Sequence, residues 1–246
     1  MQSMTPDPWW RSYRWTLGLC AVMALVNIGL FPRAPDALQR LVEWLQFDRQ
    51  AVLQGELWRL LTGNMVHWSV EHFLLDVGAF AIMGLLYERH LRHYPWILAA
   101  AGMSVGCGML VFLPEMGIYR GLSGVDSGQF AAALCVECVL ASGQARRWLW
   151  IAPAAAIFAS KILYECATGE MFFGTESLGS IGLPTPLAHA AGTAAGILVT
   201  VFTTPLPRPM PMPLQYHRNV VEDEQPRFPD QGVHLQRDFS VAPEVR

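Results

Sequence analysis

The sequence predicts an all-α membrane protein, with six transmembrane helices in one bundle and a disordered C-terminal tail. Two observations support this fold class. First, 52% of the 246 residues are hydrophobic and only 15% are charged, whereas soluble domains carry roughly 25% charged residues. Second, the charged residues are clustered, which leaves uncharged runs long enough to cross a bilayer. The net charge of −3 gives no reason to expect a nucleic-acid partner.

Apolar runs of helical length define the six predicted spans. The first is uncharged from Trp15 to Phe31, near the minimum length for crossing a bilayer. No small-x-small cleavage site follows it, so we interpret it as a retained helix rather than a signal peptide. The third and the sixth contain Gly-xxx-Gly spacings, which let helices pack closely. The predicted spans cover about residues 15–31, 67–87, 94–114, 121–143, 148–166 and 186–204.

The segments outside the spans differ in character. After the first span, Leu38, Leu41, Val42 and Leu45 recur at helical spacing among polar residues, which predicts an amphipathic helix at the membrane surface. From Pro205 onward, prolines alternate with other residues before a charged stretch, a composition typical of disorder. We therefore divide the chain into a cytoplasmic N-terminal segment, a membrane domain and a cytoplasmic tail, at residues 1–14, 15–204 and 205–246.

Arginines beside the span ends orient the predicted bundle. Six spans place both termini on one side, and three pairs of arginines lie against span ends on that side, which makes it cytoplasmic. In this topology Ser123, His189, His72 and Asp76 lie at one depth, about a turn below the outer surface. Ionisable groups at membrane depth are costly and usually face an interior or a wet cavity.

The central stretch of the sequence is Gly121-Leu122-Ser123-Gly124, at the start of the fourth span. A serine hydroxyl is a weak nucleophile and needs a base. His189 is the only histidine in the middle of another apolar run, so we expect a Ser–His pair inside a membrane protein. The alternative is that Ser123 is a small packing residue at a helix contact.

A pair of ionisable residues also lies in the fifth span. Lys161 and Glu165 are four residues apart and so share one helix face. They pair with each other, or Lys161 extends to the headgroups; we favour the second interpretation.

Four separate elements of this sequence resemble the rhomboid family of intramembrane serine proteases, over residues of about 56–204. Trp58-Arg59 looks like the family's W-R signature. His67-xxxx-His72-xxx-Asp76 is similar to its H-x4-H-x3-N element. The other two elements are Gly121-Leu122-Ser123-Gly124, which matches G-x-S-G, and Ala188-His189-xx-Gly192-xxx-Gly196, which matches the element that carries the general base.

The resemblance implies a mechanism and a setting. Ser123 would attack a peptide carbonyl, and His189 would carry the proton to the leaving amine. The Ser123 N–H and His72 would bind the oxyanion, with Gly121 and His67 lining the cavity. A dyad of this family needs no third carboxylate. The expected partners are membrane-anchored protein substrates in a lipid bilayer, with no cofactor and no metal.

One run narrows the resemblance within the family. Residues 119–125, Tyr-Arg-Gly-Leu-Ser-Gly-Val, look most like rhombosortases, bacterial rhomboids that are thought to process proteins with a C-terminal Gly-Gly sorting tail. This implies the bacterial inner membrane, with the active site opening to the periplasmic side.

The sequence departs from the family pattern at three positions. Asp76 stands where many rhomboids carry an asparagine of the oxyanion hole, and we predict a neutral carboxyl group that donates a hydrogen bond there. The alternative is an ionised Asp76 that orients His189 or His72. Asp126 and Ser127 replace an apolar residue and an aromatic one, so we expect them to modulate the site.

Three other functions fit the sequence less well than a protease does. A non-catalytic rhomboid-like protein that binds membrane clients usually lacks the serine or the histidine, and this chain has both. An aspartyl protease that uses Asp76 and Asp126 would need Y-D and G-x-G-D contexts, which are absent from the sequence. A metal site at His67, His72 and Asp76 lacks an H-E-x-x-H motif.

Overall fold

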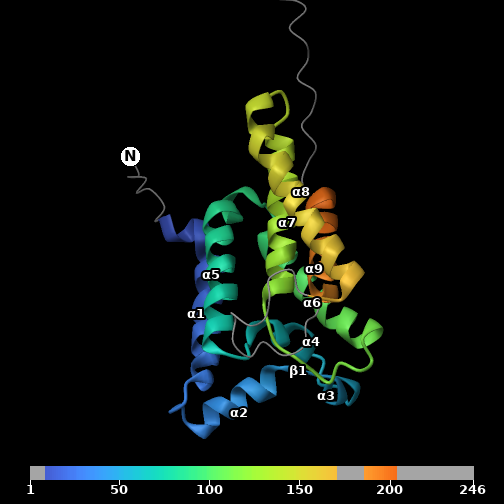
Figure 1. Cartoon of the computed structure of the whole chain (residues 1–246). Helices are drawn as coiled ribbons and strands as arrows, with labels where there is room; N and C mark the ends of the chain where they lie inside the picture. Colours follow the sequence, from blue (N-terminus) through green and yellow to red (C-terminus); the bar gives the residue numbers. More distant parts are fainter. Residues whose placement is uncertain (1–8, 171–185, 204–246) are drawn as a thin grey trace, which may run out of the picture. The chain divides into compact units, whose positions relative to one another are not determined.

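The computed structural model describes residues 9–170 and 186–203, and within them it consists almost entirely of helices (Figure 1). The predicted tail at 205–246 lies outside the described residues. In these two ranges, four short 3₁₀ helices and one two-stranded sheet accompany the α-helices. The elements are η1 (Trp9–Tyr13), α1 (Arg14–Val26), η2 (Asn27–Leu30), α2 (Asp36–Leu45), β1 (Phe47–Asp48), α3 (Arg49–Leu53), α4 (Arg59–Thr62), η3 (Gly63–Met65), α5 (Val70–Tyr87), η4 (Glu88–His90), α6 (Tyr94–Phe112), β2 (Ile118–Tyr119), α7 (Ser123–Leu140), α8 (Ala145–Thr168) and α9 (Pro186–Thr203).

Five described helical segments are long and apolar enough to cross a membrane, which agrees with the predicted all-α membrane class. The fourth predicted span, α7, is not among them. It has 18 residues, but its first turns carry the polar side chains of Ser123, Asp126, Ser127 and Gln129. The five segments that are long and apolar enough are Trp10–Leu30, Val70–His90, Tyr94–Phe112, Ala145–Thr168 and Pro186–Thr203.

The second predicted span began too early. Helix α5 begins at Val70, because the Ser69 side chain accepts the backbone N–H of His72 and caps the helix. His67 therefore precedes the helix instead of lying in it. The fourth span ends at Leu140, before the predicted end at Gly143, and α8 begins three residues earlier than expected.

The segment between α1 and α5 is held by Arg59. Its guanidinium donates to the backbone carbonyls of Glu43 and Gln46, at 2.9 Å each, and to the Glu56 carboxylate. These bonds fasten the end of the amphipathic helix α2, which forms as predicted, to α4. The arginine of the W-R pair therefore has a structural task, which is to hold the loop that leads into the bundle.

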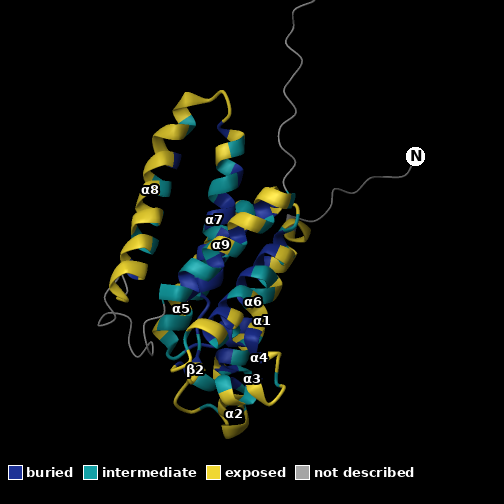
Figure 2. Cartoon of the chain, turned by 90° about the vertical axis from the view of Figure 1, so that its right-hand side faces the viewer, coloured by how far each residue is buried: buried dark blue, intermediate teal, exposed yellow. Residues whose placement is uncertain are grey.

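Glycines bring α7 and α9 into direct backbone contact. A Cβ atom at Gly192 would collide with the carbonyl oxygen of Gly124, and one at Gly196 would collide with that of Gly128. Only residues without side chains let two backbones approach so closely. In Figure 2 the facing parts of α7 and α9 are buried, whereas α8 is exposed along most of its length. The tight pair places the first turns of α7 and α9 beside each other.

Candidate active site

Ser123 is the first residue of α7, directly after a bend at Gly121. Gly121 has a φ of +141°, which glycine adopts without strain. Its N–H donates to the Gly63 carbonyl, and its own carbonyl accepts the Tyr119 hydroxyl at 2.9 Å. Burial raises the pKa of Tyr119, so this hydroxyl keeps its proton and remains a donor. The loop before the serine is thus fixed on both sides.

His189 contacts Ser123 directly. The distance between Nε2 of His189 and Oγ of Ser123 is 3.0 Å, within hydrogen-bonding range. Both side chains lie at the helix starts that the α7–α9 glycine contacts bring together, and His189 is buried. The two residues singled out in the sequence therefore meet, although 66 positions separate them.

The other ring nitrogen of His189 faces α8, which the sequence analysis did not anticipate. Nδ1 lies 2.6 Å from Oε2 of Glu165, and that same oxygen lies 2.9 Å from Nζ of Lys161. Lys161 does not extend to the headgroups as we favoured; the pairing alternative holds. The signal in the sequence was the presence of a lysine and a glutamate, four residues apart, within a predicted span.

Asp76 and His72 form a second pair, on one face of α5. Oδ2 of Asp76 lies 3.1 Å from Nε2 of His72 and accepts the backbone N–H of Leu122 at 2.8 Å. Nδ1 of His72 is buried without a hydrogen-bond partner among the described residues. Oδ2 of Asp76 thus faces two nitrogen donors, Nε2 of His72 and the backbone N–H of Leu122. This geometry favours the alternative in which an ionised Asp76 orients His72.

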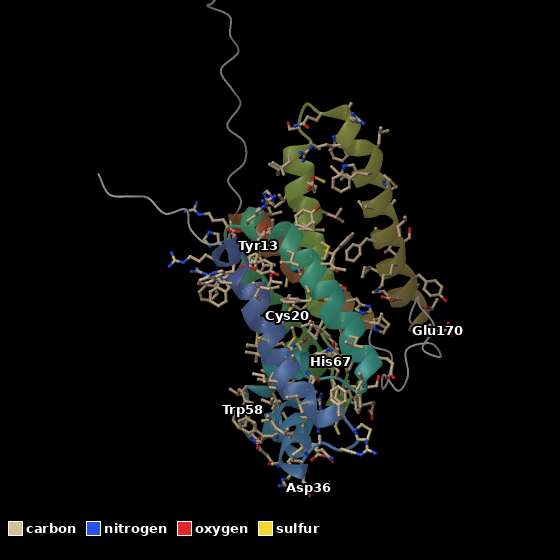
Figure 3. The ribbon with its side chains drawn as sticks, turned by 90° about the vertical axis from the view of Figure 1, so that its left-hand side faces the viewer. Tyr13, Cys20, Asp36, Trp58, His67 and Glu170 are labelled. Carbon is tan, nitrogen blue, oxygen red and sulfur yellow. The ribbon has the colours of Figure 1, made fainter. Side chains whose placement is uncertain are left out.

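His67, labelled in Figure 3, is fully buried inside the bundle. Its backbone N–H donates to Oδ1 of Asn27 at 3.0 Å, and its Nε2 lies 3.5 Å from Oδ2 of Asp76. Burial lowers the pKa of His67, which favours a neutral ring. His67 therefore packs directly against the His72–Asp76 pair.

The polar partners of His189 in the described structure do not include the two remaining candidates on α7. Ser127 donates its hydroxyl proton to the backbone carbonyl of Ser123 at 2.8 Å. Oδ1 of Asp126 is buried and has no hydrogen-bond partner among the described residues. Neither side chain orients the histidine, which takes its acidic partner from α8.

The first turn of α7 can bind negative charge. A helix leaves its first backbone N–H groups without carbonyl partners, and its dipole favours an anion at that end. The N–H of Ser123 belongs to this set, whereas that of Leu122 is already donated to Asp76. The ring of His72 lies beside Gly121, where an added Cβ would be 3.1 Å from it. The backbone N–H of Ser123 is therefore a donor available to an oxyanion beside the Ser123 hydroxyl.

A comparison with protein families agrees with this arrangement. The sequence matches the Rhomboid domain over residues 54–205, which includes every candidate site residue. No curated protein matches the chain. The matched region covers more than half of the chain and contains the Ser123–His189 contact. The chain belongs to the rhomboid family, whose members are generally intramembrane serine proteases, and it is a multi-pass membrane protein.

Proposed function

We propose that this protein is an intramembrane serine protease that cleaves membrane-anchored proteins with a Ser123–His189 dyad. The observation that carries the proposal is the 3.0 Å contact between the serine hydroxyl and Nε2 of His189 within a rhomboid domain. A nucleophile that touches its base is the geometry required for acyl transfer.

The reaction follows from the positions of these two groups. Oγ of Ser123 attacks the scissile carbonyl as Nε2 of His189 takes its proton. The C–N bond then breaks, and the same nitrogen gives that proton to the leaving amine. Water hydrolyses the acyl-enzyme with His189 as the base, which restores the free serine.

The developing oxyanion has its donors at the start of α7. The Ser123 N–H and the helix dipole stabilise it, and the His72 ring adds to this when its Nδ1 carries a proton. Asp76 acts on the oxyanion through His72, because its Oδ2 already accepts the N–H of Leu122 and contacts His72.

For the substrate, we propose proteins with a C-terminal Gly-Gly sorting tail. The run at residues 119–125 supports this rhombosortase assignment. The setting would be a bacterial inner membrane, with both termini cytoplasmic and the site opening to the periplasm, as the arginine distribution favours.

Co-expression tests the proposal. A protein that ends in a Gly-Gly tail, produced with the full chain, is expected to lose its tail, and Ser123→Ala should leave it intact at an equal level of the protease in the membrane. Cleavage that continues with Ser123→Ala would overturn the protease assignment. Cleavage of other membrane-anchored proteins, with Gly-Gly tails left untouched, would overturn only the substrate class.

A further inference from the structure

Helix α8 presents a buried carboxylate to the candidate base. Glu165 is 1% exposed and His189 is 3% exposed. Ile151 and Glu165 are the two residues of this 24-residue helix that the described structure buries. The helix otherwise turns large apolar side chains such as Leu163 outward. A helix with so little buried surface that nevertheless buries an acid against a histidine indicates a specific task for that acid.

The charge of this acid is compensated in place. A carboxylate at membrane depth is expensive unless it is paired. Nζ of Lys161 lies 2.9 Å from Oε2 of Glu165, the oxygen that also contacts His189. The lysine side chain is 19% exposed, so its ammonium group turns inward from the helix surface to reach this oxygen.

The distances decide which nitrogen of His189 carries the proton. A carboxylate has no hydrogen, so its approach to Nδ1 at 2.6 Å requires an N–H there. The Lys161 ammonium lies 3.0 Å from the same Nδ1, and by itself it would donate to a bare Nδ1 and move the proton to Nε2. The carboxylate is the closer partner, so Nε2 keeps its lone pair toward Ser123.

We propose that Glu165, held by Lys161, is the positioning residue of the active site and completes a Ser123–His189–Glu165 triad. It fixes the ring tautomer and orientation and stabilises the imidazolium that forms during the reaction. This inference rests on the proposed function, because it assigns a role toward the base of that reaction. Glu165 touches neither the substrate nor the nucleophile.

The groups that face His189 are few. Among the described residues, α8 contributes Glu165 and Lys161, and α7 contributes the Ser123 hydroxyl. Helix α6, which also packs on α9, has two titratable side chains. Tyr94 accepts a hydrogen bond from Gln129, and Cys107 lies with Leu187 at the helix surface. Within the part of the chain that the structure describes, one carboxylate and one ammonium therefore set the local charge at the ring.

A fluorophosphonate probe measures the base without a known substrate. Oγ of Ser123 displaces fluoride at phosphorus, and its proton passes to His189. In the full chain in detergent micelles, Glu165→Gln should lower the maximal labelling rate at least about tenfold, because the tautomer is no longer fixed. Glu137→Gln is the matched control, because Glu137 also pairs with a basic residue, Arg147, but lies at the other end of α7.

The pH dependence separates positioning from support of the fold. Labelling needs neutral His189, so its rate rises with pH on the acid limb. A carboxylate stabilises the imidazolium, so Glu165→Gln should move the midpoint of that limb down by about one pH unit. An ammonium disfavours the imidazolium, so Lys161→Met should move the midpoint up by a similar amount. Loss of structure alone would not give opposite shifts.

The outcomes distinguish the two proposals. Labelling of wild type that persists in Ser123→Ala, or no labelling of wild type at all, overturns the proposed function and the triad with it. Ser123-dependent labelling with Glu165→Gln at the wild-type rate and midpoint overturns the triad alone. Glu165→Gln could also melt at a much lower temperature than Glu137→Gln. In that case Lys161→Met decides the question, because this variant keeps the carboxylate of Glu165. An unchanged midpoint of the acid limb in Lys161→Met overturns the triad.

Discussion

Two histidine–carboxylate pairs approach the Ser123 region, and they are built differently. His72 and Asp76 lie one turn apart on α5, and the carboxylate also accepts a backbone N–H from Leu122. His189 and Glu165 come from α9 and α8, and the carboxylate is balanced by a lysine instead. The first pair forms wherever α5 forms, whereas the second requires two helices to stay together.

The packing around the two helices of the second pair is also unequal. Helix α9 is locked to α7 by glycine contacts between backbones. Helix α8 faces α7 and α9 across an apolar cavity of about 650 Å³, lined by residues such as Ala155 and Phe158. The nucleophile and the base are therefore fixed tightly, while the acid behind the base is carried by a loosely packed helix.

The largest effect is expected at the tight contact itself. Ser123→Ala and His189→Ala should each lower the rate of substrate cleavage by at least about 10³-fold, and the double variant should be no slower than either one. The reason is that the two side chains act as one unit. Steady-state cleavage rates of the three variants, at matched protein levels, measure this. If the rate losses of the two single variants add in the double variant, the two residues act independently and do not form a dyad.

The glycine contact should tolerate no added atom. Gly192→Ala is expected to lower the free energy of unfolding by about 1–3 kcal/mol and to slow labelling of Ser123, because α7 and α9 must move apart. Gly78→Ala, on α5, adds the same methyl group where nothing lies within 4 Å, and should be neutral or slightly stabilising. Thermal unfolding in detergent compares them. Equal melting temperatures would contradict the tight contact.

The pair on α5 predicts a smaller effect. If Asp76 is ionised and orients His72, Asp76→Asn and Asp76→Ala should lower the labelling rate to similar extents. The cost is about 1.5–3 kcal/mol, typical of a lost hydrogen bond to a charged group. Rates measured across pH test this. An Asn variant that keeps the wild-type rate and extends it to higher pH would instead restore the neutral-donor interpretation.

The smallest effect is expected at the cavity beside α8. Ala155→Leu adds bulk where space exists, so the free energy of unfolding should change by less than about 0.5 kcal/mol. The same unfolding measurement applies. A loss as large as that of Gly192→Ala would mean that α8 packs as tightly as α9, and the contrast between the two helices would disappear.

The sequence reveals local relations better than distant ones. The spacing of His72 and Asp76 predicted a shared helix face, and the apolar runs predicted the helical class. The contact between Glu165 and His189 joins residues 24 positions apart on two helices, and no periodicity encodes it. Similarly, the start of α5 at Val70 depends on the Ser69 cap, a side-chain bond that outweighed the apolar pattern.

The roles proposed for Ser123 and His189 came from motifs, and their 3.0 Å contact supports them. The bonding of Asp76 needed three-dimensional information, because Leu122, the donor to its carboxylate, lies 46 positions away. Pairing of Lys161 with Glu165 was one of two alternatives, and the other was favoured because headgroup contact is common for a lysine near the end of a span.

The modest apolarity of α7 has a consequence for how the protein is made. Its polar first turns carry Ser123, Asp126 and Gln129, so this helix gains less than its neighbours by entering lipid alone. Its closest packing partner, α9, carries His189 and is synthesised later. At a ribosomal rate of about 5–20 residues per second, the 66-residue separation delays the histidine by roughly 3–13 s. During translation Ser123 therefore lacks its proposed base, and the proposed dyad can form only when the last described helix has left the ribosome.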